Sequence, residues 1–156
     1  MDKERQVIFN SPVEVALRIV FILNKTTKPL DIHRLEYYTY LLVHSSDIPK
    51  SPKSIHADLP KRSNELAVNQ EVVKKALTLL ISKGLISVNY SPKSGIEYLK
   101  NENTVIFMNY FESPYSILLK ERADWLCTTF DSYNDKELAD LINKNIGIWG
   151  SEFITT

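Results

Sequence analysis

The chain has 156 residues, 44% of them apolar, and its 19 basic and 19 acidic side chains balance to a formal net charge of zero. A domain of this length buries roughly 68–70% of its unfolded surface, so it needs no disulfide or metal to fold. Cys127 is the single cysteine, which excludes an intramolecular disulfide and a zinc site built on cysteine pairs. No apolar run approaches the ~18 residues of a membrane span and no signal-peptide core follows Met1, so we expect a cytoplasmic protein. The neutral balance also argues against strong sequence-independent DNA binding.

Helix signals are strong at the start of the chain. Ser11 is the expected N-cap of a first helix, and Glu14 lies where it completes a capping box. The broad apolar face of this helix predicts a central position for it, and it should end near Lys25. A second helix is expected from Asp31 to about His44. Three of its polar side chains should lie off its apolar face: Arg34, Glu36 and Thr39.

A long irregular segment precedes the third helix. Ser45–Asn64 shows no sustained period and carries a net charge of +2. Irregular segments longer than about 12–15 residues tend to be functional or disordered. The third helix should begin with Asn69 as its cap and run to Lys83, with Gly84 ending it. The side chains expected to face inward are Val72, Val73, Ala76, Leu77, Leu80 and Ile81.

The segment after the third helix predicts a β-hairpin. Leu85–Tyr90 and Ile96–Leu99 alternate as strands, and Ser91–Gly95 supplies the turn. A helix that leads into a short hairpin is typical of winged helix-turn-helix domains. We therefore predict one mainly α domain over residues 1–156, with a winged-helix core at about 11–100 and a C-terminal helical extension at about 101–156. Three helices are expected there: about Asn101–Phe111, Ser113–Phe130 and Asn134–Asn145.

Patterns for catalysis or cofactor binding are weak. His33, His44 and His56 are the only histidines, and none shows the i, i+4 spacing that puts two metal ligands on one helix face. The simpler interpretation of His44 with Asp47, and of His56 with Asp58, is hydrogen bonding that pins the long loop. No tight glycine turn presents a nucleophile, and no glycine-rich phosphate loop occurs. We expect no catalytic residue, metal or cofactor, and no enzymatic activity.

DNA binding, as an operon regulator or as a part of a larger complex, is the main alternative. Lys74 and Lys75 should face outward on the third helix, and Lys93 lies at the tip of the hairpin. Lysines reach phosphates, whereas reading of base edges favours Arg, Asn or Gln. The two candidates for base reading, Asn69 and Gln70, lie where capping would use them.

The aromatic residues favour a protein-interaction module. Tyr37, Tyr38 and Tyr40 crowd within one helical turn, so they cannot all face one core. Tyr and Trp are enriched at interface hot spots. Asp131–Thr156 carries a net charge of −3, opposite to that of the long loop. The candidate interface residues are Tyr37, Tyr40, His44, His56, Asp58, Arg62, Glu65, Tyr115, Trp125, Trp149 and Phe153.

Several multi-residue blocks follow one another along nearly the whole chain, from Phe9 to about Phe153. The blocks are Phe9–Glu14, Leu30–Leu35, Tyr40–Ser45, Ser54–Pro60, Arg62–Leu66 and Glu112–Tyr115. They resemble the small middle component of bacterial ABC-three-component systems, the group that includes the middle subunit of Lamassu-type anti-phage defence operons.

The resemblance implies an adaptor. Such middle components are encoded between an SMC-like ABC ATPase, which senses foreign DNA or DNA ends, and an effector, often a nuclease, and they are expected to bridge the two. DNA would then be met only indirectly through the complex, and no membrane is implied. The blocks around His44, His56 and Arg62 would hold the long loop in a fixed shape for a partner. Arg62 and Glu65 could pair with each other or with charges of the partner.

Overall fold

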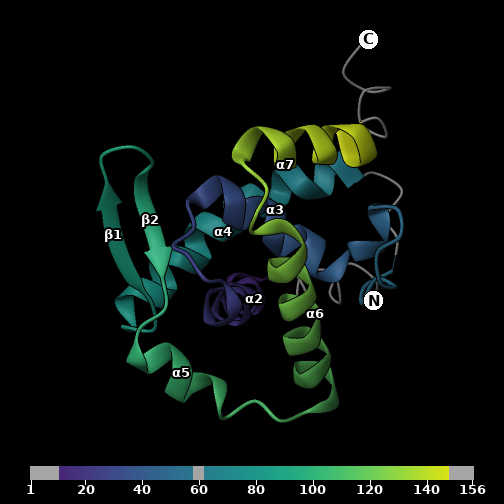
Figure 1. The fold of residues 1–156 in the computed structure, drawn as a ribbon. Coiled ribbons are helices and arrows are strands. Elements are labelled where there is room, and N and C mark those ends of the chain that lie inside the picture. Colours follow the sequence, from purple (N-terminus) through teal and green to yellow (C-terminus); the bar gives the residue numbers. More distant parts are fainter. Residues whose placement is uncertain (1–10, 58–61, 148–156) are drawn as a thin grey trace.

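Helices make up most of the fold, and one small hairpin supplies its β-structure. The computed structural model describes residues 11–57 and 62–147, with side chains in the second range from Glu65 onward. The elements in chain order are α2 (Pro12–Lys25), α3 (Ile32–Val43), η1 (Ser45–Asp47), α4 (Arg62–Ser82), β1 (Ser87–Ser91), β2 (Gly95–Leu99), α5 (Glu102–Met108), α6 (Pro114–Phe130), α7 (Asp135–Ile142) and η2 (Asn143–Gly147). Figure 1 shows α2 at the centre, α6 along one side, α7 across the top and the hairpin at the left. The predicted mainly α class is confirmed.

Helix α2 is the centre of the core, as its broad apolar face predicts. It contacts α3, α4, α5 and α6. Its fully buried side chains include Val15, Ile19, Val20, Phe21, Ile22 and Leu23. Ser11 caps it, since its Oγ accepts a hydrogen bond from Glu14 N at 3.3 Å. The carboxylate of Glu14 accepts a hydrogen bond from Tyr115 on α6.

Helix α3 is buried on nearly all sides, so the expectation that its polar side chains lie off the core is wrong. Arg34, Glu36 and Thr39 are 4%, 5% and 0% exposed. Both α4 and α6 pack against α3, which leaves little of its surface to solvent. Burying such groups is tolerated when they are hydrogen-bonded. Thr39 Oγ1, for example, donates to Leu35 O at 2.7 Å.

Helix α4 begins at Arg62, well before the predicted start, so the irregular segment is shorter than expected. Asn69 does not cap this helix. Its buried side chain donates 2.8 Å hydrogen bonds to Glu36 O and Thr39 Oγ1 on α3, and these tertiary bonds compensate for the weak helix propensity of asparagine. The helix ends where predicted, before Gly84, whose φ of +68° is a left-handed conformation that favours glycine.

The predicted hairpin is confirmed as a two-stranded antiparallel sheet. Val88 lies opposite Tyr98, and Tyr90 lies opposite Ile96. An isolated antiparallel bridge joins Leu30 to Tyr98, with N···O distances of 2.9 and 2.8 Å. This bridge attaches β2 to the connection between α2 and α3.

The C-terminal helices share the same core as the rest of the fold. Their buried apolar side chains include Met108, Leu119, Ala123, Leu126, Phe130, Leu138 and Ile142. Asn101, Ser113 and Asn134 are the N-caps, each at the start that its sequence signal predicts. Among the described helices, none is long and apolar enough to cross a lipid bilayer.

Candidate protein-interaction site

The segment after α3 is folded back onto that helix by hydrogen bonds. Tyr40 OH donates to Asp47 Oδ2 at 2.5 Å, and the His56 N–H donates to Val43 O at 3.0 Å. Ser46 N donates to the Ser54 hydroxyl at 2.9 Å. Residues 45–57, called the α3 loop below, are therefore held against α3; residues 58–61 of the predicted loop lie outside the described residues.

Four of the predicted interface residues form a continuous chain of rings. The ring centroids of Tyr40 and His44 are 4.8 Å apart, those of His44 and His56 are 5.9 Å apart, and those of His56 and Tyr115 are 6.4 Å apart. Tyr40 and His44 are only 2% and 4% exposed, which corrects the expectation that they contact a partner directly. They support the α3 loop from inside, whereas His56 and Tyr115 are half-buried.

Tyr115 joins the α3 loop to two helices. Its hydroxyl donates to Glu14 Oε1 at 3.1 Å, and the hydroxyl oxygen lies 3.0 Å from His56 Nε2. Because a phenol has one proton, and Glu14 accepts it, the His56 Nε2–H is the donor of the second bond. The starts of α2 and α6 are thereby tied to the loop.

Burial holds this pair in its uncharged form. Burial, and then the positive charge of Arg18 and the neighbouring His44, lower the pKa of His56 to about 4. Burial and the Glu14 carboxylate raise the pKa of Tyr115 to about 12. A general acid or base works best with a pKa near the operating pH, so neither group is tuned for proton transfer at neutral pH. The described residues also contain no group of three or more His, Cys, Asp or Glu side chains that could hold a metal ion.

A buried charge cluster lies beside the ring chain. Arg18 on α2 is 2% exposed, and burial lowers the pKa of its guanidinium. Tyr115 and then Glu14 and Glu65 oppose this effect, and the two carboxylates do so because their negative charge favours the charged arginine. Glu65 therefore takes part in an internal electrostatic link between α2 and α4. The remaining predicted residues of this group and of the tail lie outside the described side chains: Asp58, Arg62, Trp149 and Phe153.

A polar cluster, which was not predicted from the sequence, joins α3 to the connection between α6 and α7. The Arg34 guanidinium donates to Phe130 O at 3.1 Å, to Tyr133 O at 2.7 Å and to Asp135 Oδ1 at 2.9 Å. Burial lowers the pKa of Arg34, but its hydrogen bonds with Asp135 and Tyr38 raise it more. The one sequence signal was an arginine directly beside the apolar positions of α3.

Asp131 extends the same cluster toward α2. Its Oδ1 accepts a hydrogen bond from Tyr38 OH at 2.8 Å, and its Oδ2 accepts one from Thr26 Oγ1 at 2.9 Å. Helices α2, α3 and α6 therefore meet at one carboxylate. Of the three tyrosines that crowd within one turn of α3, Tyr38 and Tyr40 are buried in the core.

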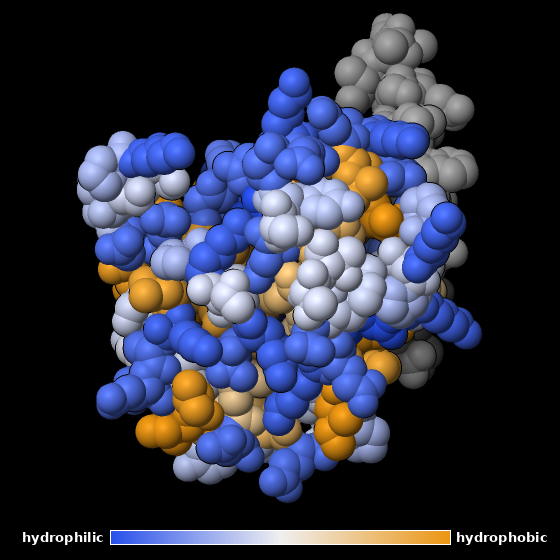
Figure 2. Space-filling model, in the orientation of Figure 1, coloured by the Kyte–Doolittle hydropathy of each residue, from blue (hydrophilic) through white to orange (hydrophobic). Residues whose placement is uncertain are grey.

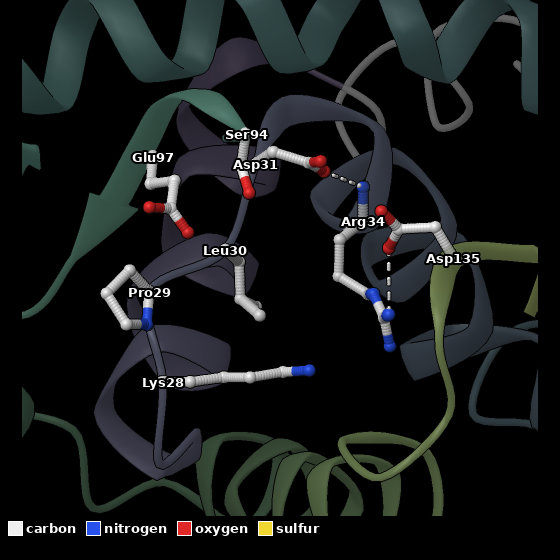
Figure 3. A pocket seen from close by; sticks show the side chains of 8 residues that line it. All are labelled: Lys28, Pro29, Leu30, Asp31, Arg34, Ser94, Glu97 and Asp135. Atoms are coloured by element: carbon white, nitrogen blue, oxygen red, sulfur yellow. Dashed lines mark hydrogen bonds and ion pairs between the residues drawn. The ribbon is translucent and has the colours of Figure 1, made fainter. Parts of the chain in front are cut away.

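A polar hollow of about 210 Å³ opens beside Arg34 (Figure 3). Figure 3 shows Lys28 extending into it, with Glu97 of β2 and Asp31 at the start of α3 on its walls. The hollow is smaller than the roughly 300–1,000 Å³ of typical small-molecule sites, and side chains of both charges line it. It suits water or a single polar side chain better than a cofactor.

Tyr37 and Trp125 do not join the ring chain. Tyr37 is half-buried and lines a second hollow with Asp135 and Leu138 of α7. Trp125 is also half-buried and packs edge to face on Phe130, with ring centroids 5.7 Å apart. Each keeps part of its ring at the surface.

Exposed apolar side chains occur on the hairpin and on α5 and the start of α6, two regions that the sequence did not single out. The exposed apolar side chains of the hairpin, called the hairpin surface below, are Val88, Tyr90 and Ile96. Those of α5, of the turn after it and of the start of α6, called the α5–α6 surface below, are Val105, Ile106, Tyr110, Ile117 and Leu118. Figure 2 shows apolar atoms on the lower rim, over α5 and over the first turns of α6. Ile81 was expected to face inward and is 43% exposed, because it lies about 100° around the helix from the buried Leu80.

The three lysines of the DNA-binding alternative are all exposed. Lys74 and Lys75 lie on α4, and Lys93 lies in the turn of the hairpin. Asn69, a candidate for base reading, is buried against α3, whereas Gln70 is exposed. The three lysines are therefore accessible for phosphate contact. Of the two candidates for base reading, Gln70 alone is accessible, because Asn69 is buried.

Comparison with known proteins gives one match. The family model described as "ABC-three component (ABC-3C) system Middle Component 2" matches residues 8–152, a range that includes every described element. No curated protein and no solved structure matches the chain.

Proposed function

The chain belongs to the Middle Component 2 family of ABC-three-component systems, and we propose that it is the non-enzymatic adaptor of a Lamassu-type defence complex in the cytoplasm. In this proposal it bridges an SMC-like ABC ATPase, which senses DNA, and an effector nuclease. Membership of the family makes the chain a component of a multi-subunit system. The observation that carries the bridging role is the presence of two exposed apolar surfaces of opposite charge.

The two surfaces differ in their charged surroundings. Residues 74–100, which include the hairpin surface, contain five lysines and one glutamate, a net charge of +4. Residues 101–121, which include the α5–α6 surface, contain three glutamates and one lysine, a net charge of −2. Charge complementarity selects partners, so surfaces of opposite sign favour two different proteins. Exposed apolar side chains in each surface supply the area that binding removes from water.

The finer fold assignment supports the same role. We infer that residues 12–99 form a winged helix-turn-helix unit, because α2, α3, α4 and the hairpin follow one another in that order. The bridge between Leu30 and Tyr98 takes the place of the short strand that such domains have between their first two helices. A winged helix with an apolar hairpin is suited to protein contact.

The absence of an enzymatic role is part of the proposal. His56 and Tyr115, which are joined by a 3.0 Å hydrogen bond, have pKa values of about 4 and about 12, both far from the neutral pH at which acid–base catalysis would operate. Their geometry is that of a structural link among α2, α6 and the α3 loop.

One observation favours a second candidate, a winged-helix DNA-binding protein. Lys74, Lys75 and Lys93 are exposed, within residues 74–100, whose net charge is +4. Such a face would bind phosphates without reading sequence, and its affinity would fall steeply with salt. A gel-shift series with duplex DNA at increasing salt tests this candidate, because binding by the isolated chain with a slope of several units would favour it.

Co-purification tests the adaptor role. The chain is co-expressed with the ATPase and effector components of its system, and each component is tagged in turn. We expect every tag to recover all three proteins in a fixed ratio. A chain that purifies without either component would contradict the proposal.

A further inference from the structure

We propose that β1 is the docking edge for an extended, acidic segment of one partner component, which adds to the hairpin as a third β-strand. This inference rests on the proposed adaptor function and assigns one of its two contacts. The occupant is a peptide segment in which apolar residues alternate and acidic residues flank them.

One face of the hairpin exposes apolar side chains to solvent. The register places Val88, Tyr90, Ile96 and Tyr98 on one face of the sheet. Tyr98 is half-buried against the core, whereas Val88, Tyr90 and Ile96 are 48%, 76% and 52% exposed. Two strands alone cannot bury such a face. A third strand beside β1 would place its own apolar side chains next to Val88 and Tyr90 and remove part of their surface from water.

The outer edge of β1 is open in a manner that proteins usually prevent. Within the part of the chain that the structure describes, β1 pairs only with β2. An edge strand is normally protected by a charged residue, a proline or a bulge. The sequence of β1, Ser87–Ser91, contains no charge and no proline, and its pairing with β2 runs without interruption. The edge therefore offers backbone N–H and C=O groups to an incoming strand.

The hairpin is held firmly at its base. Asn101 Nδ2 donates to Ser87 Oγ at 3.1 Å, and Thr104 Oγ1 donates to Leu85 O at 2.6 Å. The bridge to Leu30 fixes the second strand from the other side. A strand that is already ordered binds a partner at a lower entropic cost.

The charge around β1 selects an acidic occupant. Lys83 precedes the strand and Lys93 follows it, and both are exposed. Lys74 and Lys75 extend the positive potential along α4, so an acidic segment gains attraction at both ends of the edge. A DNA duplex is the less suitable occupant, because Val88, Tyr90 and Ile96 place apolar surface where phosphate contact requires donors.

The test compares the affinities of the full chain for each purified partner component. The hairpin variant is Tyr90→Ser with Ile96→Thr, and the matched control is Val105→Thr with Ile106→Thr, since these α5 side chains are similarly exposed at 47% and 55%. We expect the hairpin variant to lose about tenfold or more in affinity for one component while its affinity for the other stays within about twofold, as expected for a localised hot spot. The control variant should keep full affinity for the hairpin-binding component. Lys83→Glu with Lys93→Glu should weaken the same contact.

Hydrogen exchange on the complex supplies the second readout. The amides of residues 87–91 that point away from β2 should gain protection when the component binds, because a third strand pairs the outer edge. Wild-type affinity of the hairpin variant for both components, or binding without protection of β1, would overturn the inference while leaving the adaptor role intact. Duplex DNA binding that the hairpin variant alone loses would overturn the choice of a protein occupant. A wild-type chain that binds neither component would instead contradict the adaptor function itself.

Discussion

His56 gives the fold a pH dependence at the scale of a single residue. Its pKa is about 4 in the folded chain and 6.5 when unperturbed. The unfolded chain takes up this proton first as the pH falls, so the stabilisation is complete above pH 6.5 and is lost progressively toward pH 4. We expect a loss of about 1–2 kcal/mol in the free energy of unfolding, because solvent screens a half-buried ring. Urea denaturation at a series of pH values measures it.

The control for this prediction is His56→Gln, which keeps a side-chain N–H donor but does not titrate. The variant should show a shallower fall in stability over the same pH range. An identical pH dependence in the variant and the wild type would show that other groups cause it.

Arg34 and Asp135 form an ion pair whose two members should differ in importance. Arg34 is 4% exposed, whereas the side chain of Asp135 is 81% exposed. Arg34→Lys leaves the carbonyl groups of Phe130 and Tyr133 short of donors, so we expect a loss of about 2–3 kcal/mol. Asp135→Asn removes mainly an exposed charge and should cost less than about 1 kcal/mol. Thermal unfolding of both variants measures the two losses of stability. Equal losses would contradict the larger role of Arg34.

These residues also show what sequence could and could not predict. The loop-pinning role of His56 was predictable from its position in a polar, irregular segment. Its partner Tyr115 was not, because a contact across 59 positions leaves no local signal. Arg34 was placed off the core by helical periodicity, which cannot show that α4 and α6 cover α3 from both sides.

At the scale of elements, α4 is stabilised by hydrogen bonds from Asn69 to α3, although the sequence predicts Asn69 as a helix cap. Asn69→Ala removes two hydrogen bonds to α3, and it leaves Thr39 and the Glu36 carbonyl with fewer partners. We expect a loss of about 1–2 kcal/mol in the free energy of unfolding, although alanine is the better helix former. Gln70→Ala, at the exposed neighbouring position, is the matched control and should change stability little. A neutral Asn69→Ala would contradict the account of this helix.

Local capping signals predicted most other elements. Ser11, Asp31, Ser113 and Asn134 cap the helices that their sequence contexts predict, and Gly84 ends α4. Such signals lie within a few residues of the boundary they determine. The predicted start of α4 is wrong because an asparagine can serve either as a helix cap or as a buried hydrogen-bond donor. Only the packing of α3 decides between these two roles.

At the scale of the whole molecule, the net charge is zero but the positive and negative side chains lie in different segments. The neutral total contains a positive segment around the hairpin and a negative segment at α5 and the start of α6. Opposite charges also occur in residues 45–64, at +2, and in residues 131–156, at −3, and partner contacts of these two segments stay predictions. Exposure of the hairpin was not predictable, because alternating apolar residues usually indicate a buried strand face.

The central claim is that this chain holds the ATPase and effector components together. Light scattering after size-exclusion chromatography measures the mass of mixtures of the two components with and without the chain. We predict a species whose mass contains all three proteins when the chain is present, and separate components when it is omitted. Association of the ATPase and effector to the same extent without the chain would contradict the account.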